Sequence, residues 1–162
     1  LIHENKLLQK RIKKKKMPQP ISIVISNDYE SLLGLPFFNQ PVSRWLITSK
    51  EIKNNNQIKG YDRVIMFEEN WSKTLIKIAK FGISKLLILG GSQVTNALLL
   101  EDKVNELQLT ITPKLVGGDV PWIPGNMNTL PDFLSMKNAW ILKENKTLSN
   151  NEIMLLYRRN KK

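Results

Sequence analysis

The sequence contains no cysteine and only one histidine, His3, which lies close to its first residue. Without cysteine, disulfide bonds, thiolate zinc sites and a cysteine nucleophile are excluded. With a single histidine in that position, neither a histidine-dependent catalytic triad nor an imidazole metal cluster is expected. The chemistry of this protein must therefore come from other side chains, from the backbone or from a bound group.

Carboxylates are also scarce, since 14 acidic residues stand against 25 lysines and arginines. The adjacent pair Glu68 and Glu69 is the most noticeable, because it follows a predicted strand. Successive strand residues point to opposite faces, so these two do not form a coupled acid and base. We expect them to lie in a solvated loop.

Long apolar runs are absent as well. No stretch reaches the roughly 20 residues that a membrane-spanning helix requires, and no apolar segment of the kind found in signal peptides follows the basic N-terminal residues. We therefore expect no membrane partner. Together with the absence of cysteine, these features favour a cytoplasmic location.

The formal net charge of +11 would suit nucleic acid, an anionic membrane surface or a phosphorylated small molecule. Basic residues cluster only at residues 10–16 and 158–162, and the four tryptophans are not interleaved with them as a stacking platform for bases requires. We interpret most of the charge as solvated surface and expect no nucleic-acid partner. A non-catalytic basic module that binds RNA or DNA is the alternative.

The length of 162 residues predicts one domain, residues 1–162. Strands alternate with helices up to about residue 100 and then follow one another, which predicts an α/β fold whose sheet is mostly parallel with an antiparallel C-terminal hairpin. The predicted strands are Ile21–Ser26, Arg44–Thr48, Arg63–Phe67, Leu86–Leu89, Val104–Thr112, 140–142 and 152–157, and the predicted helices are Trp71–Phe81 and Ser92–Leu100.

The stretch from Lys85 to Leu100 is the most informative part of the chain. Its apolar run, Leu86–Leu89, predicts a strand buried on both faces. Gly90 and Gly91 end this strand, and Ser92 offers a hydroxyl to cap the helix that follows. A helix start of this kind presents unpaired N–H groups and a partial charge of about +0.5, which together suit a phosphate. A tight turn without a ligand is the alternative.

The glycine pair is not a Walker loop, because no Gly-Lys-Ser/Thr sequence follows it. Hydride transfer suits a chain with so little acid–base machinery, since the cofactor supplies the chemistry. A dinucleotide would need the glycine-flanked helix start for its pyrophosphate and polar groups for a ribose phosphate. The strand-end residues Ser26, Asn27, Thr48 and Ser49 are candidates for the second role, with turn capping as the alternative.

Three segments in this order resemble the reductase domain of the riboflavin-biosynthesis RibD family. They are residues 86–99 (LLILGGSQVTNALL), 103–110 (KVNELQLT) and 112–118 (TPKLVGG). Residues 18–21, 37–41 and 43–48 are similar to stand-alone members that lack a deaminase domain. The likeness covers nearly the whole chain.

The resemblance implies a dihydrofolate-reductase-like fold, in which helices flank a mixed sheet, and NADPH as hydride donor. It implies a small phosphorylated aminopyrimidine as substrate, whose ribosyl chain is reduced to ribityl: 5-amino-6-(5-phosphoribosylamino)uracil or a related form. It also implies a homodimer. The cofactor-binding residues that it implies are Asn27, Gly90, Gly91, Ser92, Gln93, Val94, Thr95, Asn96 and Ala97.

Two departures from the family pattern bear on activity. Family members often carry a substrate-contacting glutamate just before the glycines, where this chain has Leu89, which can make no such hydrogen bond. The family's opening strand and helix have no counterpart upstream of Leu1, so we expect an N-terminally truncated domain. A dihydrofolate reductase, or a relative with another substrate, is therefore the alternative enzyme.

Overall fold

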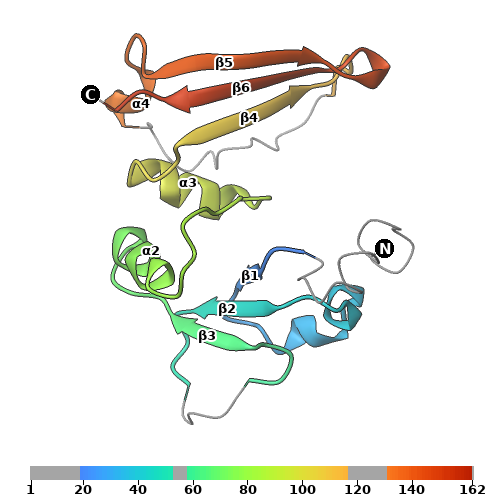
Figure 1. Cartoon of the computed structure of the whole chain (residues 1–162), viewed down its shortest axis with the longest axis vertical. Coiled ribbons are helices and arrows are strands. Elements are labelled where there is room, and N and C mark those ends of the chain that lie inside the picture. The colour runs from blue at the N-terminus through green and yellow to red at the C-terminus, as the bar shows by residue number, and fades with distance from the viewer. Residues whose placement is uncertain (1–18, 53–57, 117–130, 162) are drawn as a thin grey trace. The chain divides into compact units, whose positions relative to one another are not determined.

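A computed structural model of the chain describes residues 19–52, 58–116 and 131–161 (Figure 1). The chain divides into two compact units, Leu1–Gly82 and Ile83–Lys162. The basic cluster at residues 10–16 and the last two residues of the segment 112–118 lie outside the described residues.

The first unit is built on a parallel sheet in the order β1-β2-β3. Its strands are β1 (Ser22–Ile25), β2 (Arg44–Thr48) and β3 (Arg63–Met66), with two short 3-10 helices, η2 (Ser31–Gly34) and η3 (Pro36–Asn39), between β1 and β2. The strands are rich in β-branched and aromatic residues, which favour a pleated, buried surface. The parallel arrangement and the three strand positions confirm the sequence prediction.

The core of the first unit centres on Leu46, which has no exposed surface, and on the buried rings of Tyr29 and Tyr61. Phe38 packs its ring against that of Tyr61 at a centroid distance of 5.4 Å. Burial of such large apolar groups contributes about 1.5–3 kcal/mol for each side chain. The central strand β2 is therefore held firmly, and so are the residues at its carboxyl end.

Helix α2 (Trp71–Ala79) closes the first unit. The side chain of Asn70 caps it by accepting a hydrogen bond of 2.9 Å from the N–H of Lys73. Trp71 and Ile78 are buried, as the helical spacing of apolar residues predicts. Gly82 follows the helix with φ of +83°, a conformation that favours glycine.

The second unit contains an antiparallel sheet in the order β4-β6-β5. Its elements are α3 (Ser92–Leu100), β4 (Glu106–Ile111), α4 (Asp132–Ser135), β5 (Trp140–Thr147), η4 (Ser149–Asn151) and β6 (Ile153–Arg159). The predicted C-terminal hairpin is confirmed, although β5 continues to Thr147, further than its apolar residues indicated. The turn is made by Asn150 and Asn151, both with positive φ, which asparagine tolerates well.

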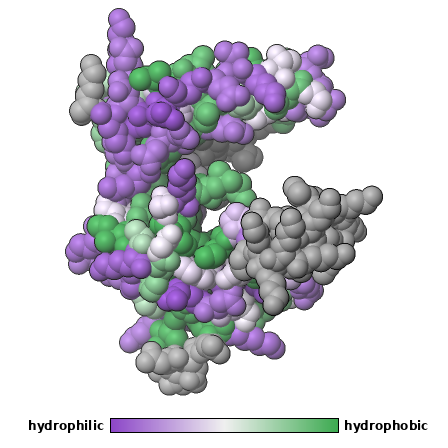
Figure 2. All heavy atoms as spheres, viewed as in Figure 1, coloured by the Kyte–Doolittle hydropathy of each residue, from purple (hydrophilic) through white to green (hydrophobic). Residues whose placement is uncertain are grey.

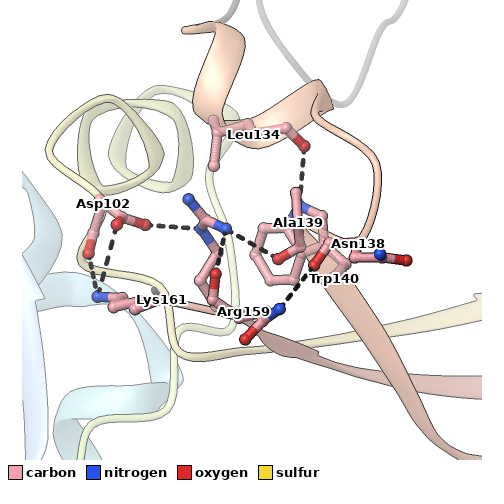
Figure 3. A network of polar contacts seen from close by, with 8 residues as sticks. Asp102, Leu134, Asn138, Ala139, Trp140, Arg159 and Lys161 are labelled. Carbon is pink, nitrogen blue, oxygen red and sulfur yellow. Dashed lines mark hydrogen bonds and ion pairs between the residues drawn. The ribbon is translucent and has the colours of Figure 1, made fainter.

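Arg159 ties the end of β6 to the rest of the second unit (Figure 3). Its side chain is only 6% exposed, and its Nε donates to Asp102 Oδ1 at 2.9 Å. Its Nη1 donates to the carbonyl oxygen of Ala139 at 2.8 Å. The guanidinium also lies 5.4 Å from the ring centroid of Phe133 and 5.8 Å from that of Trp140. One cation thus links β6 to the turn after α3 and to the segment before β5.

The prediction of a buried strand at Leu86–Leu89 is wrong. These residues are in neither of the two sheets, and their exposed fractions are 47%, 83%, 37% and 90%. Within the described residues their backbone has no strand partner, so the apolar pattern alone did not make a sheet. The prediction of a capping hydroxyl at Ser92 is also wrong: Gly91 occupies the N-cap position of α3, and no side chain caps this helix.

Candidate functional site

The start of helix α3 presents backbone donors that no side chain of the described residues caps. Gly91 is the N-cap, so the N–H groups of Ser92, Gln93 and Val94 have no acceptor within the helix. The N–H of Thr95 is the first to be used, and it donates to the carbonyl oxygen of Gly91 at 3.1 Å. No acidic residue lies in the first turn. A bound anion would therefore meet three free donors and no competing carboxylate.

The two glycines before α3 have different roles. Gly90 has φ of +139°, a backbone conformation that side-chain-bearing residues rarely adopt. Gly91 has φ of −37°, which does not itself require glycine. A Cβ atom at either position would meet no atom within 4 Å. Gly90 thus allows the turn, and Gly91 leaves the space beside the free amides open.

The remaining predicted cofactor residues on α3 offer no backbone donor to a ligand. Asn96 is 7% exposed, and the backbone N–H groups from Thr95 onward take part in helical hydrogen bonds. If this helix start holds a phosphate, the contacts come from Gly91 to Val94. The assignments at Thr95, Asn96 and Ala97 stay predictions that the structure does not favour.

Asn27 lies at the carboxyl end of β1, where a loop begins. Its Oδ1 accepts hydrogen bonds from Thr48 Oγ1 at 2.9 Å, from the N–H of Ser49 at 2.9 Å and from Ser49 Oγ at 3.0 Å. Thr48 is 2% exposed, and its Oγ1 accepts in turn from the N–H of Lys50 at 3.1 Å. The structure therefore joins three of the four strand-end residues that the sequence singled out.

The fourth strand-end residue, Ser26, has a local partner. Its Oγ accepts from the N–H of Asp28 at 3.0 Å, which is the turn-capping alternative. Lys50 was not singled out from the sequence, because a lone lysine in a lysine-rich chain carries no signal. In the structure its Nζ lies 5.4 Å from the ring centroid of the buried Tyr29, which restricts the position of its charge.

Leu89, the residue in the place of the family's substrate-contacting glutamate, is 90% exposed. Its side chain is apolar and offers neither a donor nor an acceptor. Nothing in the structure gives it a polar role, and its assignment to the substrate stays a prediction.

Glu68 and Glu69 form ion pairs with lysines of helix α2. Glu68 Oε1 lies 2.5 Å from Lys77 Nζ, and Glu69 Oε2 lies 2.7 Å from Lys73 Nζ. The hydrogen bond from Lys77 and the charge of Lys77 lower the pKa of Glu68 below its usual value. A carboxylate that stays ionised in this way is a poor proton donor at neutral pH, so Glu68 is not a candidate general acid.

Two further observations limit the chemistry. Among residues 19–52, 58–116 and 131–161, no three histidine, aspartate or glutamate side chains gather as metal ligands would. None of the helices in these ranges has the length and apolar character that crossing a membrane requires. On the face that Figure 2 shows, hydrophilic side chains occur over both units, with apolar ones among them.

Comparison with known proteins gives the family. Residues 1–150 match the RibD C-terminal domain. The chain belongs to this family. No curated protein has a sequence that matches this chain significantly.

Two solved structures share the fold of this RibD C-terminal domain at low sequence identity. One is from Shewanella sp. PV-4 and is described provisionally as a riboflavin biosynthesis protein; it has 16% identity and a TM-score of 0.59, over 87% of this chain and 74% of that one. The other is a pyrimidine reductase-like protein from Corynebacterium diphtheriae, with 20% identity and a TM-score of 0.61, over 96% of this chain and 67% of that one. The mixed α/β fold predicted from the sequence is confirmed.

Proposed function

We propose that this protein is an NADPH-dependent reductase of riboflavin biosynthesis. The observation that carries the proposal is the uncapped start of α3 behind Gly90 and Gly91, in a chain of the RibD C-terminal domain family. The backbone N–H groups of Ser92, Gln93 and Val94 would hold the pyrophosphate of NADPH. Backbone donors suit this task because they are fixed by the helix and cost no ordering of side chains.

When bound, NADPH supplies a hydride. The protein must then orient the acceptor carbon and exclude water, and it needs no nucleophile or metal for these tasks. A reaction in which the cofactor supplies the hydride and the protein only orients the acceptor agrees with a chain that has no cysteine and a single histidine. The proposed substrate is a small phosphorylated aminopyrimidine, 5-amino-6-(5-phosphoribosylamino)uracil or a related form, whose ribosyl chain gains a hydride and a proton to become ribityl.

Leu89 favours a second candidate for the substrate. An exposed leucine cannot replace the hydrogen bond that a glutamate would make at this position. A site built without that acceptor suits a less polar group, so a relative with another reducible substrate is the alternative within the same reaction class.

The test is an assay of the full-length protein with NADPH and the phosphoribosylaminouracil. We expect the absorbance of the reduced cofactor to fall only when both are present. Calorimetry with NADPH alone separates binding from chemistry. Binding without turnover would point to another substrate, and the absence of both would refute the reductase proposal. Binding of methotrexate would indicate a dihydrofolate reductase instead.

We also propose that the enzyme is a cytoplasmic homodimer with a small-molecule partner and no nucleic acid. Light scattering at several protein concentrations gives the mass in solution. Binding to nucleic acid that weakens steeply with salt would contradict the last part of this proposal, because such binding depends on released counterions.

A further inference from the structure

The contacts that hold helix α3 are concentrated in its C-terminal half. Its buried residues, Asn96, Leu98 and Leu99, all lie in that half. At its start no side chain caps the helix, and the preceding run Leu86–Leu89 belongs to neither sheet of the described residues. The position of the free N–H groups at the start therefore depends on contacts made near the other end of the helix.

The end of α3 is a turn of the kind that glycine usually makes. Asp102 follows the C-cap with φ of +51°, and its N–H donates to the carbonyl oxygen of Leu99 at 3.0 Å. The N–H of Lys103 donates to the carbonyl oxygen of Leu98 at 2.8 Å, which completes a Schellman motif. Glycine adopts such a φ without strain, whereas aspartate only tolerates it. The backbone conformation therefore does not explain why this position carries a carboxylate.

The carboxylate of Asp102 has a partner on β6. Its Oδ1 accepts a hydrogen bond of 2.9 Å from the Nε of Arg159 (Figure 3). The nearly buried guanidinium is fixed in turn by the carbonyl oxygens of Ala139 and Asn160, at 2.8 and 3.0 Å. Lys161 adds a second cation, because its Nζ donates to the backbone carbonyl oxygen of Asp102. The end of α3 is thereby fastened to the central strand of the antiparallel sheet.

The two cations also supply a charge that the helix itself lacks. Helix α3 has no basic residue in its last turn, where the carbonyl groups carry a partial charge of about −0.5. Arg159 and Lys161 bring positive charge to this end from β6. A phosphate would complement the opposite end in the same way, about 13 Å away along a helix of nine residues.

We propose that Asp102 and Arg159 are positioning residues for the phosphate site at the start of α3. A short helix moves as one rigid element, so the ion pair at its end fixes where the free N–H groups of its first turn lie. Neither side chain contacts the ligand. All the elements involved belong to the second compact unit. The inference rests on the proposed function, because the phosphate at this helix start is that of NADPH.

The test replaces Asp102 by glycine in the full chain. Glycine adopts φ of +51° without strain, so Asp102→Gly keeps the turn and removes only the carboxylate. We expect NADPH to bind about fivefold more weakly in calorimetry. We also expect the helical N–H groups of α3 to exchange with solvent about tenfold faster. Asn150→Gly, at φ of +65° in the hairpin turn of the same unit, is the matched control and should change neither quantity.

A second variant, Asp102→Asn, separates position from stability. Its amide oxygen still accepts from the Nε of Arg159, although the charge is lost. We expect this variant to be less stable than the parent and yet to bind NADPH with an affinity within about twofold of the parent's. If it binds as weakly as Asp102→Gly, the hydrogen bond does not set the position of the helix, and the inference is wrong.

A merely structural role gives different results. Asp102→Gly would then bind NADPH like the parent wherever both are folded, and exchange would quicken equally in α3 and in the paired strands β5 and β6. Either result would overturn the inference and leave the proposed function intact.

If Asp102→Gly does not fold, the test uses the parent protein. Coupling between two sites is reciprocal, so bound NADPH should slow hydrogen exchange at the N–H groups of Asp102 and Lys103. Unchanged exchange at these two groups would refute the inference. If the parent does not bind NADPH at all, the proposed function fails, and this inference with it.

Discussion

Replacement of Gly91 by valine tests whether the start of α3 binds a phosphate or only forms a turn. A Cβ at this position meets no atom within 4 Å, and φ is −37°, so valine is compatible with the fold. The added branches would occupy the space beside the free N–H groups of Ser92 and Gln93. We therefore expect a folded protein that has lost most of its phosphate contacts at α3.

The size of the loss follows from the number of donors. Three N–H groups, those of Ser92, Gln93 and Val94, are available at the start of α3. A hydrogen bond to a charged group contributes about 1.5–3 kcal/mol, and the loss of two such bonds costs about 3 kcal/mol at the lower end of that range. This corresponds to NADPH binding on the order of 100-fold more weakly.

Calorimetric titration with NADPH, together with thermal unfolding of the unliganded protein, measures the two effects separately. Gly34→Val is the matched control, because a Cβ at Gly34 also meets nothing within 4 Å and its φ is not positive. Equal affinities of the parent and Gly91→Val would refute the assignment of the phosphate to α3. A large fall in unfolding temperature in Gly91→Val would show instead that the glycine serves the fold.

Three further predictions concern stability. Asp102→Asn removes the charge beside the buried guanidinium of Arg159 and should lower the free energy of unfolding by about 2 kcal/mol in urea titration; a change under about 0.5 kcal/mol would mean that carbonyl oxygens suffice. Gly90→Ala must adopt φ of +139° and should cost about 1–3 kcal/mol in thermal unfolding, whereas an unchanged midpoint would contradict the strain. Hydrogen bonds from Ser43 and from the backbone of Arg44 lower the pKa of Asp62 below its ordinary 3.8. The carboxylate therefore contributes stability above that pH, and this contribution is lost as the pH falls through the lower, folded-state pKa. Asp62→Ala should flatten the acid dependence of the free energy of unfolding, and an unchanged curve would exclude this carboxylate as its source.

The parallel sheet was predictable because its residues carry a local signal. Arg44–Thr48 was predicted with the bounds that β2 has, since a β-branched and aromatic run lies between polar residues. The C-terminal hairpin was found for the same reason, although the polar second half of β5 was missed. The second half of β5 is a strand because it pairs with β6, and its own composition does not favour a strand.

Leu86–Leu89 shows where local pattern fails. Four apolar residues in a row predict burial only if neighbouring strands cover them, and the run itself does not say which strands those are. In the described residues no strand pairs with this run. The predicted N-cap of α3 was wrong by one residue. Gly91 takes this position and accepts the first helical hydrogen bond through its carbonyl oxygen, so no hydroxyl is needed.

The candidate site was only partly predictable. The glycine pair and the strand-end residues were found because each has a recognisable local role. That Asn27 Oδ1 is already occupied by Thr48 and Ser49 could not be read from the sequence, since the partners are 21 and 22 residues away. The distinction between a ligand and a residue that orders a ligand requires the hydrogen bonds themselves.

The exposed run at Leu86–Leu89 also has a consequence for the behaviour of the protein in solution. An exposed apolar segment that belongs to neither sheet of the described residues is a template on which other chains can add strands, and such segments promote aggregation. Here the segment is short and its flanks oppose propagation: Lys85 adds a positive charge on one side, and Gly90 and Gly91 have low strand propensity on the other. We therefore expect the glycine pair before α3 to limit self-association through this segment as well.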